Sequence, residues 1–141
     1  MPLYPKAPSG GGIIQTASAV LAVATTTTSV TYVDLLTLAV TTGGSSRLEI
    51  YASFSTSNNG GSGGQDYLRL TVDGVEVQKM GAEQWTVIEG GAIFFVTDVL
   101  SAAAHTIALQ WQTTTGRTLR CNPTSTTRPE HASIMAIETR G

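Results

Sequence analysis

The chain has 141 residues and a net charge of −2, with 41% hydrophobic and only 13% charged residues. This length suits one domain that needs neither a metal nor a disulfide, and the single cysteine, Cys121, excludes an intrachain disulfide. The two lysines and six arginines are scattered, which argues against nucleic-acid binding through clustered positive charge. No window approaches the roughly 18 uninterrupted apolar residues of a transmembrane helix, so no membrane partner is expected.

Residues 1–12 contain three prolines and a run of three glycines, which sustain neither a helix nor a central strand. They are predicted to form a flexible, extended arm ahead of a domain that spans residues 13–141. Two interpretations of the arm stay open: a disordered terminus, or a docking arm that orders against a neighbouring subunit. The docking interpretation takes its apolar anchors from Leu3, Tyr4 and Pro5.

Residues 13–24 form an apolar stretch that ends in Ala22-Val23-Ala24, a pattern similar to a signal-peptidase site. Polar residues interrupt the stretch, and only one lysine precedes it. A first β-strand is the favoured interpretation, with a signal peptide as the alternative.

A period of two dominates from here on, which is typical of half-buried strands. Ser29–Val40 is predicted to form two short strands separated by a bend at Asp34, followed by a turn over residues 43–46. The clearest strand comes next, with one side chain set facing the core and the other facing outward. The inward set is Leu48, Ile50, Ala52 and Phe54, and the outward set is Arg47, Glu49, Tyr51 and Ser53.

Asn58–Gly64 is predicted to be an exposed loop of Asn, Gly and Ser. Two alternating runs follow, over residues 68–72 and 75–77, and Asp73-Gly74 lies between them. Because both residues accept positive φ, this dipeptide predicts a tight β-hairpin.

A strand is expected over residues 93–99. The strand after it has an apolar face that consists of His105, Ile107, Leu109 and Trp111. Residues 113–131 are predicted to be a long loop with a short strand near 118–120, and residues 134–138 form the last strand. The sum is eight to ten short antiparallel strands without a helix. The predicted fold is therefore an all-β jelly-roll sandwich.

Catalytic and metal-binding constellations are not evident. His105 is expected to be a core or interface histidine, and Cys121 would meet His105 or His131 only by coincidence of folding. The ten acidic residues are interpreted as solvated surface charges, and no metal site, cofactor or enzymatic activity is expected. Trp111 is predicted to lie in the core, whereas Trp85 is a candidate for an exposed ligand contact.

The outward faces of the predicted strands carry few charges. A face of small polar residues without Lys or Glu is poorly protected against association, and it suits burial against another copy of the chain. The predicted subunit interface consists of Tyr51, Ser53, Thr106, Ala108, Gln110 and Gln112.

Three segments together resemble a known family: Ser29–Val40 leading into Ser46–Ser55, then Ala104–Trp111, and finally Ile134–Glu138. Their order is similar to that of the small C1q/TNF-like jelly-roll domains of bacteriophage virion proteins, which include head decoration proteins and the tips of fibres or spikes. The resemblance implies a homotrimer around a threefold axis that attaches to a capsid or tail protein through a terminal arm.

The expected function is therefore that of a non-enzymatic virion structural protein, a trimeric capsid decoration or cement protein. It would be made in the host cytoplasm and lie on the virion surface, with the major capsid protein or another virion protein as partner. The alternative is a receptor- or carbohydrate-binding tip domain of a phage tail fibre or spike, with Trp85 and the loops at 58–64 and 113–131 as contacts.

Overall fold

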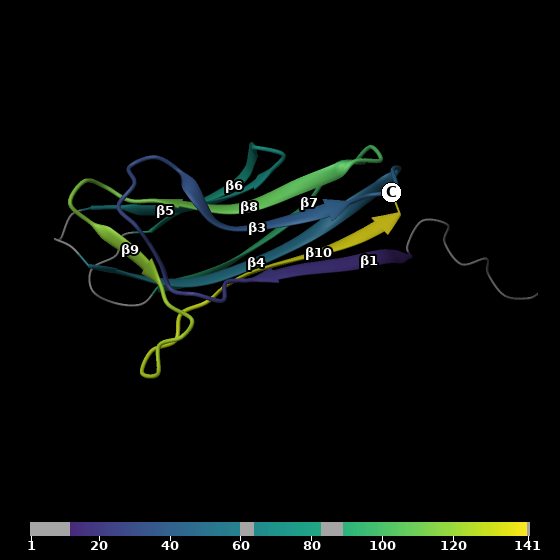
Figure 1. Cartoon of the computed structure of the whole chain (residues 1–141). Coiled ribbons are helices and arrows are strands. Elements are labelled where there is room, and N and C mark those ends of the chain that lie inside the picture. Colours follow the sequence, from purple (N-terminus) through teal and green to yellow (C-terminus); the bar gives the residue numbers. More distant parts are fainter. Residues whose placement is uncertain (1–11, 60–63, 83–88, 141) are drawn as a thin grey trace, which may run out of the picture.

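The structure is a computed structural model that describes residues 12–59, 64–82 and 89–140. The fold is an all-β sandwich of ten strands in two antiparallel sheets (Figure 1). The strands are β1 (Ile13–Val20), β2 (Thr25–Thr27), β3 (Val33–Thr41), β4 (Ser46–Asn59), β5 (Asp66–Val72), β6 (Val75–Ala82), β7 (Glu89–Val96), β8 (Ala104–Gln112), β9 (Thr118–Cys121) and β10 (Ala132–Arg140).

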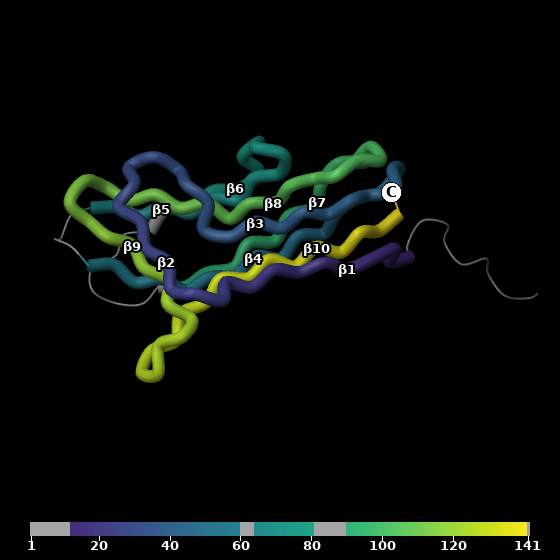
Figure 2. Tube along the Cα trace, in the orientation of Figure 1, coloured from purple at the N-terminus to yellow at the C-terminus, as the bar shows by residue number. Residues whose placement is uncertain are grey.

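The six-stranded sheet follows the order β1-β10-β4-β9-β2, with β7 on the other edge of β4, and the four-stranded sheet follows β3-β8-β5-β6. The short strands β2 and β9 pair with each other beyond the end of β1 and β10, and β9 meets the last residues of β4. The other eight strands alternate between the two sheets except at the β5–β6 hairpin, as the backbone tube shows (Figure 2). This is the predicted jelly-roll arrangement.

The core lies between the two sheets and is built by the predicted alternation. The inward residues of β4, from Leu48 to Phe54, are at most 4% exposed, and Trp111 of β8 is 1% exposed. Burial of these side chains is the main stabilising contribution, since each large apolar side chain contributes roughly 1.5–3 kcal/mol. The predicted core position of Trp111 is confirmed.

The β5–β6 hairpin is confirmed as well. Asp73 and Gly74 connect the two strands with φ values of 51° and 79°, as a tight turn between twisted strands requires. The turn also touches β8, because the backbone N–H of Asp73 donates to the carbonyl oxygen of Thr106 at 2.8 Å.

The prediction of two strands within Ser29–Val40 is wrong. The structure has one strand, β3, which begins at Val33 and contains a register shift between Asp34 and Leu36. Such a bulge absorbs one extra residue without ending the strand. It turns Leu35, Leu38 and Val40 toward the core, so the face predicted from simple alternation is offset at its start.

The interpretation of all acidic residues as solvated surface charges is also wrong. Asp66, Glu130 and Glu138 are at most 1% exposed. Each carboxylate accepts several hydrogen bonds, which compensate for its loss of water. Glu130, for example, accepts from the Ser57 hydroxyl at 2.8 Å, and Arg120 lies 3.1 Å from the same oxygen.

The start of the predicted loop at 58–64 is likewise not exposed. Asn58 is the penultimate residue of β4 and is 6% exposed. Its side-chain amide donates to Asp66 at 2.7 Å, so it belongs to the packed end of the sandwich. In the ranges that the structure describes there is no helix long and apolar enough to cross a membrane.

Candidate assembly face

The outward surface of the six-stranded sheet over β10, β4 and β7, called the assembly face below, exposes large apolar side chains. Antiparallel pairing places Met135 opposite Tyr51, and Tyr51 opposite Phe94, so that three strands contribute one transverse row. Phe94 is 53% exposed, while Tyr51 and Met135 are each 40% exposed. The ring centroids of Tyr51 and Phe94 lie 4.9 Å apart, so the two rings pack against each other on the surface.

The next row along the strands consists of small side chains. Ser133 of β10 is opposite Ser53 of β4, and Ser53 is opposite Ala92 of β7. The hydroxyls of Ser53 and Ser133 lie 2.8 Å apart, so they satisfy each other rather than a charged partner. A row of small residues beside a row of large ones leaves a trough.

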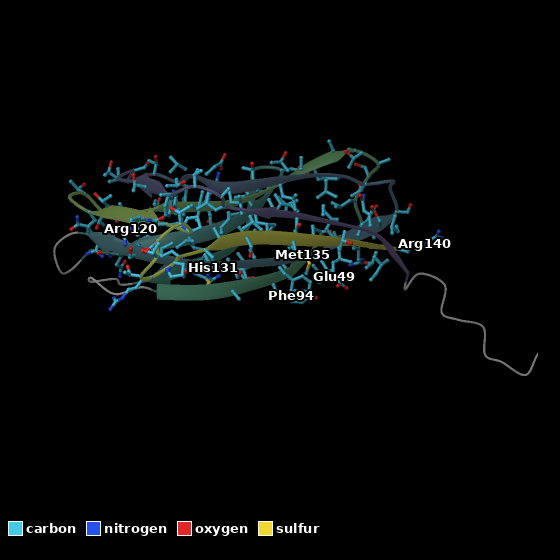
Figure 3. All side chains as sticks on the ribbon, turned by 60° about the horizontal axis from the view of Figure 1, so that its bottom comes forward. Glu49, Phe94, Arg120, His131, Met135 and Arg140 are labelled. Atoms are coloured by element: carbon cyan, nitrogen blue, oxygen red, sulfur yellow. The ribbon has the colours of Figure 1, made fainter. Side chains whose placement is uncertain are left out.

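This trough, called the hollow below, has a volume of about 410 Å³. Its outward-facing lining consists of Tyr51, Ser53, Ala92, Phe94, Ser133 and Met135, none of which carries a charge. Figure 3 shows Phe94 and Met135 close together on this face, with Glu49 beside them. An apolar hollow with a few hydroxyls at its floor is suited to an apolar or proline-rich polypeptide segment rather than to a charged ligand.

Polar and charged groups gather at the ends of the face. At one end His131 accepts or donates a 3.1 Å hydrogen bond with Ser55, and Arg120 lies nearby in Figure 3. Glu49 is opposite Val96 and Ile137, one row beyond Tyr51. The apolar centre is therefore bounded by polar groups, which is the usual anatomy of a protein interface.

The six residues predicted for a subunit interface do not share one surface. Tyr51 and Ser53 lie on the assembly face, whereas the other four belong to β8 on the opposite sheet. Of these four, Thr106 is exposed, Gln110 and Gln112 are half-buried, and Ala108 is only 5% exposed.

Gln110, on the outer face of the four-stranded sheet, has hydrogen-bond partners within its own chain. Gln110 donates to Asp34 at 2.7 Å and accepts from Arg69 at 2.8 Å. The guanidinium of Arg69 also lies 4.1 Å from the centroid of the Tyr32 ring. These contacts link β3, β8 and β5 across the sheet, so the side chain of Gln110 already has a donor and an acceptor within its own chain.

His105 is buried as predicted, and its partners make it a structural residue. Its ring joins β8 to Asp73 in the hairpin turn, with 2.7 Å between Nδ1 and Oδ2. The side-chain hydrogen bond to Asp73 raises the pKa of His105, and the same bond lowers the pKa of Asp73.

Cys121 has the properties of a core residue. It is 0% exposed, and burial raises the pKa of its thiol to about 12. A thiol with this pKa is protonated at neutral pH and is a poor nucleophile. Within the described segments, no group of three or more His, Cys, Asp or Glu residues is placed to hold a metal ion.

Leu3, Tyr4 and Pro5 of the predicted docking arm and Trp85, the predicted ligand contact, lie outside the described residues. Three large contributors to the assembly face were not singled out from the sequence: Phe94, Val96 and Met135. The alternation of Ala92, Phe94 and Val96 with Ile93 and Phe95 contains the signal, but both sets are apolar. Only the pairing with β4 shows which set faces out.

No protein-family model matches the chain, and no curated protein matches it. Among solved structures, the chain is similar to part of dimeric latent PorU from Porphyromonas gingivalis, with 13% sequence identity and a TM-score of 0.42. The match covers 99% of this chain but only 14% of the PorU chain.

Proposed function

We propose that this chain is a non-enzymatic structural subunit that assembles with copies of itself through the assembly face. The observation that carries the proposal is the exposed row of Met135, Tyr51 and Phe94 beside an uncharged hollow. Monomeric soluble proteins rarely expose contiguous apolar patches of this kind, and where they do the patch often marks an interaction site.

The shape of the subunit supports a surface role. Jelly rolls recur in viral capsid proteins, and their loops and faces diverge without altering the core. Together with the resemblance of three segments of this chain to phage virion domains, this supports a homotrimeric decoration or cement protein on a virion. In that setting each copy contacts several neighbours, so modest individual affinities combine.

Native mass spectrometry at micromolar concentration tests the assembly. We expect a homotrimer for the parent chain and a monomer for Phe94→Glu, because the substitution places a charge in the centre of an apolar contact. Val75→Glu is the matched control, since Val75 is also exposed, at 66%, but lies in the β5–β6 hairpin away from this face. A parent chain that is monomeric at this concentration contradicts the proposal.

The location on a particle needs a separate experiment. Antibodies raised against the chain should label intact purified virions, and a particle reconstruction should show the sandwich on the outer surface. Absence of the chain from purified virions contradicts the virion role while leaving the self-assembly result unaffected.

A further inference from the structure

The hollow in the assembly face has a shape and chemistry that fit one particular segment of this chain. We propose that Pro2–Pro8 of a neighbouring copy docks in the hollow between β10, β4 and β7. The inference rests on the proposed self-assembly and names the segment that links one subunit to the next.

The first argument is the sequence of the segment. Pro2, Pro5 and Pro8 recur every three residues, which is the period of the polyproline II helix, so they fall on one ridge. Segments of this kind bind aromatic-lined grooves, because the extended conformation is already preferred and little entropy is lost. The hollow offers Tyr51 and Phe94 as aromatic walls and a floor of small residues.

The second argument is charge. The hollow itself is lined by uncharged side chains, and the segment carries a single charge, Lys6. Glu49 lies two residues before Tyr51 on the same outward side of β4, a separation of roughly 7 Å along the strand. A ridge of prolines in the hollow would therefore leave Lys6 within reach of the Glu49 carboxylate at its border.

The third argument concerns which copy provides the segment. Gly12 still belongs to the ladder of β1 and β10, since its carbonyl oxygen accepts from the backbone N–H of Arg140 at 3.3 Å. The hollow lies in the opposite direction along β1, at the level of Ser18 and Val20, which pair with Met135 and Ser133.

A return to the same subunit is therefore unfavourable. The path from Gly12 back to the level of Ser18 is about 20 Å at roughly 3.4 Å per residue. At about 3.1 Å per residue of polyproline II, this path takes about six or seven residues, so residues 9–11 and about half of residues 2–8 would be used before the chain reached the hollow, and too few would remain to fill it. A segment that instead continued past Gly12 in the direction of β1 would lead away from the hollow of its own subunit, and could enter the hollow of a neighbour.

Disulfide trapping between full-length chains tests the proposal. One preparation carries Tyr4→Cys and the other, with a different mass tag, carries Ser53→Cys in the floor of the hollow. The native Cys121 does not interfere, because it is buried and its thiol pKa is about 12. Thr37→Cys is the matched control partner, since Thr37 is exposed on the opposite sheet.

We expect the mixed-tag disulfide to form with Ser53→Cys in clear excess over Thr37→Cys, and to be lost when Phe94→Asp is added to the Ser53→Cys chain. If Phe94→Asp does not fold by circular dichroism, Met135→Lys provides the same test from β10. Equal yields with both partners overturn the proposal. A chain that carries both Tyr4→Cys and Ser53→Cys gives a second test, because an intrachain disulfide without the interchain product also overturns it. Native mass spectrometry of the same samples separates the two proposals, because an oligomer without the excess overturns only the docking of Pro2–Pro8.

Discussion

The Nδ1 atom of His105 lies 2.7 Å from Oδ2 of Asp73, and this contact attaches the β5–β6 hairpin to β8. The other ring nitrogen lies 3.1 Å from the carbonyl oxygen of Ser101, which can only accept. With an acceptor at each nitrogen, the doubly protonated ring is favoured, and the pKa of His105 is raised above its ordinary value of 6.5.

Asp73→Asn should lower stability in a pH-dependent way. Asparagine keeps the turn geometry and one oxygen to accept from the Thr106 N–H, but it replaces Oδ2, the acceptor for His105, with an uncharged NH2 group. The raised pKa of His105 means that the pair stabilises the fold below pH 6.5 and loses this contribution as pH rises through the folded-state pKa. Because Asp73 is 48% exposed, the contribution is screened to about 1 kcal/mol or less, roughly 3 °C in Tm.

Thermal melting of the parent chain and Asp73→Asn between pH 5 and pH 9 measures the difference in Tm between them. This difference in Tm should be largest near pH 5–6 and become smaller in alkaline solution. Asp98→Asn, at another exposed carboxylate, should show no such trend. A difference that grows with pH would contradict the assignment.

Glu138→Gln should destabilise the end of the sandwich where β1, β10 and the β3–β4 turn meet. The buried carboxylate accepts from the Ser46 hydroxyl at 2.6 Å, from the Gly43 N–H at 3.1 Å and from the Gln15 amide at 2.6 Å. These bonds, led by the one from Ser46, lower the pKa of Glu138. A glutamine presents an NH2 group to one of the donors, at a cost of about 2 kcal/mol.

Urea unfolding at two pH values checks this prediction. A carboxylate with a lowered pKa contributes stability above its ordinary value of 4.5 and loses it as pH falls through the folded-state pKa. The difference in urea midpoint between the parent chain and Glu138→Gln should therefore be large at pH 7 and smaller in acid. Equal midpoints at pH 7 would show that the three donors are satisfied elsewhere.

Asp66→Asn should be more damaging than the loss of a surface charge. Asp66 and Arg117 form an ion pair at 3.3 Å with side chains only 0% and 2% exposed. Removing the charge of one member of a buried ion pair costs about 3–5 kcal/mol, because the desolvated partner loses its attraction to that charge. Glu76→Gln is the control, because the Arg69–Glu76 pair at 3.5 Å is partly exposed and contributes at most about 1 kcal/mol. Similar unfolding free energies for the two variants would contradict this ranking.

Cys121 should resist alkylation until the domain opens. The thiol is fully buried in the core, and its raised pKa of about 12 keeps it protonated. Mass spectrometry after iodoacetamide treatment at pH 8 should show little modification in buffer and complete modification in denaturant. Rapid modification of the folded chain would show that β9 separates readily from β4.

The parts of the fold that were predictable are those controlled by local patterning. The alternation in β4 and β8 identifies core residues such as Ile50 and Trp111, because successive side chains in a strand point to opposite faces. The Asp73-Gly74 turn was predictable for a similar reason, since few residue pairs accept two positive φ values.

The errors arose where partners come from distant parts of the chain. Asp66 is buried only because Asn58, Thr113 and Arg117 converge on it from other segments. Asp34 does not end a strand, because it pairs with Gln110 of β8, which also donates to its carboxylate, and the bulge leaves Leu35 as the extra residue. No local pattern contains these contacts.

The all-β sandwich, its core and its low density of charge follow from strand periodicity and composition, which are local properties of the chain. The position of the uncharged surface, in contrast, depends on which distant strands pair with one another. Met135, Tyr51 and Phe94 are far apart in the chain, and the pairing of β10, β4 and β7 brings them into one row. The same pairing sets Ser133, Ser53 and Ala92 side by side, and the missing bulk of these three side chains forms the hollow.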